Sequence, residues 1–392
     1  MAAAGFTFAA RGPAPTQGVA GQIATETASN WPFPRAGLRG EALEKMRLEN
    51  ASLWLNARPL FTVAEDPAGN RGIVSLAPSL EAKAVLLHFW DYTNAHCLSM
   101  VPRLEAWHKR YAGEGLVVVG VHSPEFAFSS RSGNVAEAVK RLKISYPVYL
   151  DARFFLWRIF ENRHWPRTIL IAPGGSVVYD VIGSANAEAT EQAVRKALHD
   201  ARGRNFTDPL LPPLAGDRES SVCHPESPDL FCGFERGHIG SPGYKKDGAA
   251  TDYHIPSHPE VRQDEVVYLE GRWRATHQAL FPAVPAGPAG PAGSDPWELR
   301  LRFRALGVGL VMTPPPEEAG ARVRVTLDGK PVPPSFRGAD LRQGRGGQTY
   351  VTIGTPRLMR LVKQAPFGQH EIALFPEKPG TGFYVFYFEG CE

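Results

Sequence analysis

Two different hydrophobic patterns divide the chain. Between residues 81 and 201, short apolar runs alternate with stretches of helical period. Strands are predicted at 84–89, 116–121, 146–150, 168–171 and 176–181, and helices at 97–112, 134–142, 153–160 and 187–201. Strands that alternate with helices are typical of a mostly parallel sheet covered by helices. The Gly174-Gly175 pair between the last two strands predicts a hairpin, which adds an antiparallel edge.

From residue 264 to residue 390 the period is two. Apolar residues alternate with charged or polar residues at 266–269, 298–304, 322–327, 350–353 and 384–388, with no helical stretch between them. This alternation is typical of an antiparallel β-sandwich with one face in water. Asp328-Gly329 is a strong hairpin signal within it.

The remaining segments show neither period. Residues 1–45 are predicted to form an extended arm, and a short helix at 43–50 leads into an α/β domain at 46–201. Residues 202–262 are polar and contain Pro-Pro and Ser-Pro pairs, which predicts an irregular linker before a β domain at 263–392. The Pro-Ala-Gly triplets at 285–293 are too few for a collagen helix, so a flexible loop between two strands is expected there.

Composition narrows the class of protein. The 392 residues suffice for two domains, and the net charge of +3 gives no support for a nucleic-acid partner. No run reaches the roughly 18 apolar residues that a transmembrane helix needs. The first 20 residues lack the charged start and apolar centre of a secretory signal. The absence of acidic residues before Glu26 leaves an organelle transit peptide open, and the sequence does not otherwise fix the compartment.

The four cysteines are too few for a disulfide scaffold. Cys223 and Cys232 are nine residues apart and could pair; free thiols are the alternative. Cys223-His224, Cys232 and His238 could in principle bind zinc, but their spacing is unlike that of the usual ligand pairs. His88, His96, His108 and His122 are scattered along the α/β domain. We therefore expect neither a metal site nor a cofactor.

The candidate reactive residues lie at the corner between the strand at 84–89 and the helix at 97–112. It reads Phe-Trp-Asp-Tyr-Thr-Asn-Ala-His-Cys-Leu from Phe89 to Leu98. It resembles a thioredoxin active site, in which two cysteines three residues apart (C-x-x-C) sit at such a corner. Asn94 stands where the first of these cysteines would be, and Cys97 stands at the second.

Further strings strengthen a resemblance to the DipZ-type thiol–disulfide proteins. They include Met100-x-Pro102-x-Leu104, the run from Gly115 to Phe128, Trp165-Pro166, the segment from Ser227 to Arg236, and Pro356-Arg357-Leu358. The resemblance covers roughly residues 55–390. It implies an α/β thioredoxin fold followed by an all-β jelly-roll sandwich similar to a carbohydrate-binding module. It also implies a disulfide reductase ancestor, relatives that face the periplasm, and a cis-proline at Pro166.

The departures from this family decide the functional hypothesis. The nucleophile position holds Asn94, Ala95-His96 replaces the usual pair between the cysteines, and Asp91 replaces the usual Thr after the Trp. Disulfide exchange needs an attacking thiolate and a second thiol. Asn94, Cys97 and Pro166 are therefore interpreted as a vestigial site, with Cys97 buried and inert. A peroxidase is disfavoured because Thr93 and Cys97 form T-x-x-x-C rather than T-x-x-C.

The sequence thus favours a non-catalytic binding or structural subunit of a larger assembly. Its attachment device would be the arm at residues 1–45, whose aromatic and proline residues suit an interface. The rival hypothesis is a thiol–disulfide oxidoreductase-related enzyme that uses Cys97 as a single thiol. A carbohydrate site on the β-sandwich would need exposed aromatics, whereas aromatics at period two are mostly core. The aromatics available for it are Tyr268, Trp273, Trp297, Tyr384 and Tyr387.

Overall fold

The computed structural model describes residues 50–65, 71–76, 80, 82–173, 175–214, 223–286 and 295–391. The predicted arm at 1–45 lies outside these ranges, as do nearly all of the predicted helix at 43–50 and most of the Pro-Ala-Gly loop. The chain divides into two compact units, residues 1–219 and residues 220–392.

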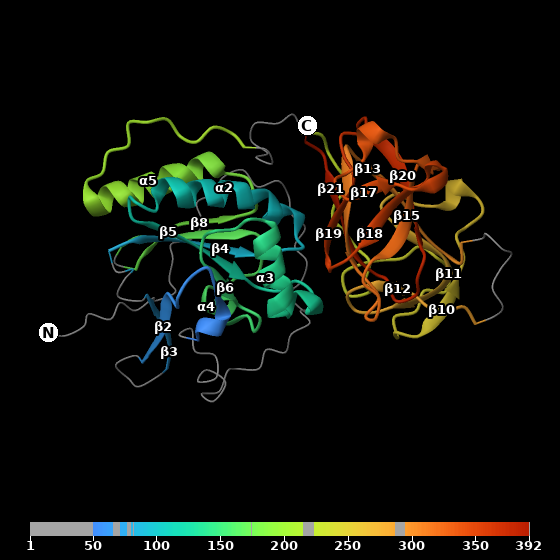
Figure 1. The fold of residues 1–392 in the computed structure, drawn as a ribbon, viewed down its shortest axis with the longest axis horizontal. Helices are drawn as coiled ribbons and strands as arrows, with labels where there is room; N and C mark the ends of the chain where they lie inside the picture. The colour runs from blue at the N-terminus through green and yellow to red at the C-terminus, as the bar shows by residue number, and fades with distance from the viewer. Residues whose placement is uncertain are drawn as a thin grey trace. The chain divides into compact units, whose positions relative to one another are not determined.

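The first unit is built on a six-stranded mixed sheet (Figure 1) with the order β1-β6-β5-β4-β7-β8. β4, β5 and β6 are parallel, whereas β1, β7 and β8 are antiparallel to their neighbours. The strands are β1 (Trp54–Leu55), β4 (Ala84–Trp90), β5 (Leu116–His122), β6 (Val148–Leu150), β7 (Arg167–Ile171) and β8 (Val177–Ile182). The helices are α2 (Ala95–Tyr111), α3 (Ser132–Arg141), α4 (Phe155–Ile159) and α5 (Ala187–Arg202). A separate hairpin joins β2 (Phe61–Glu65) to β3 (Arg71–Leu76).

Both faces of this sheet are covered. Alternate residues of β4 and β5, such as Phe89 and Val121, pack in one core with Phe155 and Trp157 of α4. α2 and α5 lie side by side along the sheet (Figure 1). The buried carboxylate of Glu191 in α5 accepts hydrogen bonds from Trp107 Nε1 at 3.1 Å and Tyr111 Oη at 2.5 Å in α2. A parallel strand that is buried on both faces reads as a continuous apolar run, which explains the run from Ala84 to Trp90.

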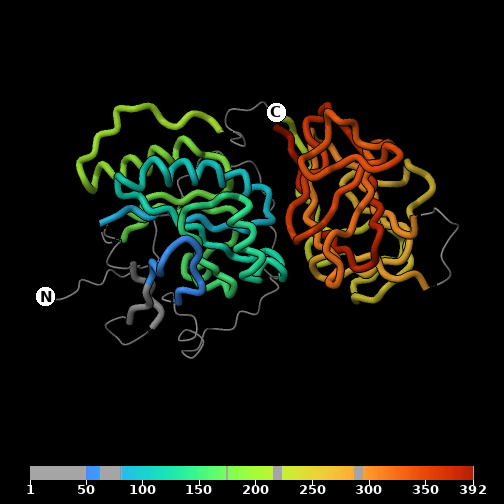
Figure 2. The backbone as a smooth tube through the Cα atoms, viewed as in Figure 1, coloured from blue at the N-terminus to red at the C-terminus, as the bar shows by residue number. Residues whose placement is uncertain are grey.

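The second unit is all β, and every pairing between its strands is antiparallel. Ten strands follow the path β17-β18-β15-β20-β13-β11-β12-β21-β14-β19, and β9, β10 and β16 pair beside it. Figure 2 traces this unit to the red strand β21 near the C-terminus. The strands are β9 (Leu230–Phe231), β10 (Ala250–Tyr253), β11 (Val267–Ala275), β12 (Leu280–Pro282), β13 (Trp297–Ala305), β14 (Gly307–Thr313), β15 (Ala321–Leu327), β16 (Lys330–Pro331), β17 (Leu341–Gln343), β18 (Thr349–Ile353), β19 (Arg357–Val362), β20 (Gly368–Pro376) and β21 (Gly382–Glu389).

The residues of the second unit that alternate with period two are buried on one face of their strands and form its core. Leu299, Leu301 and Phe303 of β13 are buried in one cluster, and the charged residues between them are less buried. Asp328 and Gly329 both have positive φ, of 52° and 74°, and connect β15 to β16 as the hairpin signal predicts. The fold class predicted from the sequence, a thioredoxin fold followed by an all-β domain, is confirmed.

The structure differs from the linker predicted at residues 202–262. Residues 203–214 pack on the first unit, where Leu211 N–H donates to Glu191 and Arg195 donates to the carbonyl oxygen of Asp208. Residues 223–262 belong to the second unit, because β9 pairs with β21 and β10 pairs with β11. The sequence could not reveal this, because strands of two and four residues show too little alternation to define a period.

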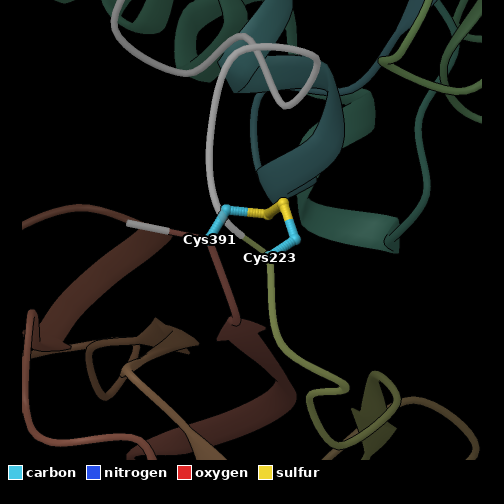
Figure 3. The surroundings of a disulfide bond; sticks show 2 residues. All are labelled: Cys223 and Cys391. Carbon is cyan, nitrogen blue, oxygen red and sulfur yellow. A yellow bond between two sulfur atoms is a disulfide. The ribbon is translucent and has the colours of Figure 1, made fainter.

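The disulfide considered possible between Cys223 and Cys232 does not form. Cys223 forms a disulfide with Cys391, 168 residues away (Figure 3). The two residues face each other in an antiparallel bridge, beside a hydrogen bond of 2.8 Å from His224 N–H to the carbonyl oxygen of Gly390. Cys232 is a buried free thiol in the core of the second unit. The bridge therefore ties Cys223, which precedes β9, to the segment just after the last strand, β21, and only the tertiary fold brings these two residues together.

Among the described residues, no helix is long and apolar enough to cross a bilayer.

Replacing Cys391 by serine should lower the unfolding free energy of the second unit by roughly 2–5 kcal/mol, because the disulfide closes a loop of 168 residues. Urea unfolding followed by fluorescence measures this loss. Cys223→Ser should have the same effect, and the double variant should lose nothing further. Equal stability of wild type and Cys391→Ser would mean that the bridge does not form in solution.

Candidate functional site

The corner at the carboxyl end of β4 begins α2 with a side-chain cap. Asn94 has extended backbone angles, and its Oδ1 accepts a hydrogen bond of 3.1 Å from the N–H of Cys97. The first N–H groups of a helix have no partner within the helix, and an asparagine cap satisfies one of them. Asn94 is therefore the N-cap of α2, at the position where the sequence comparison places a nucleophilic cysteine.

The same asparagine is held from its other side. Asn94 Nδ2 donates to Oε2 of Glu125 at 3.1 Å, and both side chains are buried. Glu125 follows β5, so this contact links the segments after two neighbouring strands. The amide of Asn94 thus uses its acceptor on the helix and its donor on Glu125, which fixes its orientation.

Asp91 is the centre of the hydrogen-bond network at this corner. Its Oδ1 accepts from the N–H and the hydroxyl of Thr93, at 2.7 and 2.6 Å. Its Oδ2 accepts from Glu125 N–H at 2.7 Å and from the hydroxyl of Ser129 at 2.6 Å. Asp91 is fully buried, and four hydrogen bonds supply the partners that a buried carboxylate requires. The residue that departs from the family pattern after the Trp therefore has a structural role here.

His122 lies against this carboxylate as a neutral ring. Its Nε2 is 3.8 Å from Asp91 Oδ2 and accepts from Tyr92 N–H at 3.4 Å. Burial lowers the pKa of His122, although the charge of Asp91 opposes the shift. The ring stacks on Tyr92 with centroids 5.5 Å apart. A neutral, stacked and buried imidazole is packed as part of the fold, without access to a reactant.

Cys97 is buried in the first turn of α2, as the sequence predicts. Burial raises the pKa of its thiol well above the ordinary value; a hydrogen bond with the backbone of Asp91 opposes the shift, and the charges of Asp91 and Glu125 add to it. A reactive cysteine needs the opposite environment, one that is exposed and electropositive. This environment disfavours the thiolate form of Cys97.

Pro166 lies at the same end of the sheet. Its peptide bond with Trp165 is cis, as expected from the family resemblance. Phe89 of β4 pairs with Arg167 of β7, so Pro166 directly precedes the residue opposite the end of β4. Trp165 Nε1 donates to the carbonyl oxygen of Ser123 at 2.9 Å, which fastens this loop to the end of β5. The structure therefore brings the three residues predicted from the sequence, Asn94, Cys97 and Pro166, to the same end of the sheet.

Sequence reasoning missed Asp151, which is buried directly after β6. It accepts backbone hydrogen bonds from Phe155, Leu156 and Trp157 and a side-chain bond from Ser123. These bonds hold the start of α4 against the end of β5. Burial raises the pKa of Asp151 to about 7, although its hydrogen bonds favour the charged form. Its position after a buried parallel strand, where Asp91 also stands, was the available signal.

The scattered histidines do not form a metal site. His88 is buried in β4 with Nδ1 3.0 Å from the hydroxyl of Thr168, and burial lowers its pKa to about 3. His108 packs near Tyr146, with ring centroids 6.3 Å apart. In the part of the chain that the structure describes, no three His, Cys, Asp or Glu side chains are grouped to hold a metal. In the second unit, Cys223 forms the disulfide, so it cannot bind zinc together with His224, Cys232 and His238.

The second unit offers no aromatic platform among the residues considered for carbohydrate. All five are buried, and Trp273 packs against Phe383 in the core with ring centroids 5.7 Å apart. The five are Tyr268, Trp273, Trp297, Tyr384 and Tyr387. Burial therefore accounts for their placement on these strands.

Comparisons with known proteins agree with this fold. Residues 227–388 match the family model described as "Thioredoxin like C-terminal domain". The chain is 32% identical over 209 residues to Protein DipZ of Mycobacterium bovis, in a match that covers 51% of this chain and 28% of DipZ. It is 29% identical over 180 residues to Protein SUPPRESSOR OF QUENCHING 1, chloroplastic, of Arabidopsis thaliana, covering 46% of this chain and 16% of that protein.

A smaller relative matches over nearly its whole length. Thiol-disulfide oxidoreductase YkuV of Bacillus subtilis is 23% identical over 141 residues, which cover 36% of this chain and 95% of YkuV. The matches to DipZ and to the Arabidopsis protein, in contrast, cover less than a third of each. The chain is thus similar to DipZ and to thiol–disulfide oxidoreductases, as the sequence strings indicate.

Alkylation tests the burial of Cys97. Iodoacetamide should label Cys97 slowly in the native protein and quickly after denaturation, because the thiol is buried and its pKa is raised. Peptide mass spectrometry distinguishes Cys97 from Cys232, which is also buried and serves as the internal control. Rapid native labelling with a midpoint below about pH 7.5 would identify an activated thiol instead.

The buried carboxyl of Asp151 should make stability depend on pH. Its folded-state pKa of about 7 lies above the ordinary 3.8, so the folded protein binds more protons between these values. The unfolding free energy of the first unit should therefore fall, by a few kcal/mol at most, as the pH rises from about 4 to about 7. The variant Asp151→Asn should show a flatter dependence over this window, whereas Ser123→Ala should extend the fall to higher pH, because it removes a hydrogen bond that favours the charged carboxyl. Identical slopes in wild type and Asp151→Asn would contradict the raised pKa.

Proposed function

We propose that this chain is a non-catalytic thioredoxin-fold protein that acts as a binding or structural subunit of a larger assembly. One observation carries the proposal. The N–H of Cys97 at the start of α2, which could stabilise a thiolate at position 94, is hydrogen-bonded to the amide oxygen of Asn94. At this corner the N–H of Cys97 is used to cap α2, where in a dithiol site it would face a thiolate.

The chemistry of disulfide exchange supports this proposal. A thiolate attacks a disulfide sulfur, and a second thiol then releases the mixed disulfide. Asn94 cannot supply the first group, and the thiol of Cys97 is buried with a raised pKa. Among the described residues, Cys97 is the only cysteine of the first unit, so no resolving partner accompanies it there.

The alternative is an enzyme related to the thiol–disulfide oxidoreductases that uses Cys97 as a single thiol. Similarity to YkuV, which is named as such an oxidoreductase, favours this alternative at the level of the fold. It requires an opening of the corner that exposes Cys97 and lowers the pKa of its thiol. A peroxidase role for Thr93 and Cys97 has less support, because the hydroxyl of Thr93 donates to Asp91.

The partner surface of the proposed subunit is the arm at residues 1–45. This part of the proposal rests on the sequence alone, in which aromatic and proline residues occur without a helical or strand period. A buried, hydrogen-bonded corner is compatible with such a role, because a binding subunit needs a stable fold and no reactive thiol.

An insulin-reduction assay with dithiothreitol tests the loss of activity. Wild type should show no rate above the blank, because the attacking thiol is absent. Asn94→Cys should gain measurable turnover, since it restores two cysteines three residues apart at a helix start. Asn94→Ser is the matched control, because serine can also cap the helix but supplies no thiol.

Wild-type turnover comparable to that of a thioredoxin would contradict the non-catalytic proposal. If that turnover also disappeared in Cys97→Ser, the result would support the alternative, an enzyme that uses Cys97 as a single thiol.

A further inference from the structure

Exposed apolar side chains concentrate on one strand of the first unit. Across the described residues, five large hydrophobic side chains are exposed, and three of them are on the six-residue strand β8. They are Val177, Val178 and Ile182, at 43%, 53% and 55% exposure. Single exposed hydrophobic residues are common, but three on one short strand indicate a surface that is covered in the working protein.

β8 is also the edge of its sheet. Within the described part of the chain it pairs only with β7, so the backbone N–H and C=O groups along its outer side have no strand partner. Sheet edges are usually protected by lysine, proline or a bulge. β8 contains neither lysine nor proline, and its pairing with β7 is irregular only near Val178. From Tyr179 to Ile182 the edge is regular and open to a further strand.

The charge of this edge is already neutralised. Asp180 is the one charged residue of β8, and Arg167 of β7 holds it with hydrogen bonds of 2.8 and 2.5 Å. Arg167 is fixed in turn by a bond to the carbonyl oxygen of Phe160. The strand therefore offers no free charge that would select a basic or acidic peptide, and its recognition features are apolar side chains and backbone groups.

We propose that β8 pairs antiparallel with β8 of a second copy of this chain, so that two six-stranded sheets become continuous. A twofold axis between Asp180 and Val181 places Tyr179 of each copy opposite Ile182 of the other and Asp180 opposite Val181, within the regular part of the strand. No like charges meet in this register, whereas an axis through Asp180 would oppose two carboxylates. The strand is thus complementary to itself. The inference is independent of whether the corner at Asn94 retains any chemistry.

Sedimentation velocity of the full chain over a hundredfold range of concentration tests this pairing. Wild type should pass from monomer to dimer as the concentration rises, because a seam of four residues is short. Ile182→Lys and Val178→Lys place a charge on the edge and should each weaken dimerisation at least tenfold. Val261→Lys is the matched control, since it adds the same charge at an exposed valine of the second unit and should leave dimerisation unchanged.

Thermal unfolding of all variants shows whether they remain folded, and the melting temperatures should agree within a few degrees because the substituted side chains are exposed. A wild type that stays monomeric at every concentration would overturn the proposal. So would a dimer that both edge variants preserve. A monomer whose melting temperature falls in Ile182→Lys would also overturn it, because the edge would then be covered by another part of the same chain.

Discussion

The carboxylate of Asp91 joins three segments that meet at the carboxyl end of β4. It bonds to Thr93 in the turn before α2, to the backbone of Glu125 after β5, and to Ser129 in the following 3-10 helix at Ala127–Ser130. A buried carboxylate is tolerated only when its oxygens have such partners. Glu125, positioned by Asp91, holds Asn94, and Asn94 caps α2. The geometry of the corner therefore depends on one buried negative charge and its donors.

This arrangement gives structural roles to two of the residues that depart from the thioredoxin-like pattern, Asp91 and Asn94. An aspartate after Trp90 is costly to bury unless Thr93, Glu125 and Ser129 supply hydrogen bonds. An asparagine at position 94 needs both an acceptor and a donor partner, and Glu125 and Cys97 supply them. Burial and the nearby carboxylates disfavour the thiolate of Cys97. A capping asparagine thus occupies the position at which a dithiol site has its attacking thiol.

Much of the fold could be predicted from local pattern. The run from Ala84 to Phe89 and the alternation in β13 each follow from burial on two faces or on one. β14 was missed because it lies between β21 and β19 and is buried throughout, so it shows no alternation. The Cys223–Cys391 bridge could not be predicted, because a separation of 168 residues carries no local signal. At the corner, the cap of Asn94 on Cys97 is local, but the contacts of Asn94 and Asp91 with Glu125 join segments that follow different strands, and a local pattern cannot reveal them.

The central claim is that Asn94 stabilises the corner in place of a reactive thiol. The most direct test is the unfolding free energy of Asn94→Cys, measured under reducing conditions so that no new disulfide contributes. The account predicts a loss of about 1 kcal/mol or more relative to wild type, because the cap on Cys97 N–H disappears and Glu125 loses a donor. Stability equal to or greater than that of wild type would contradict it.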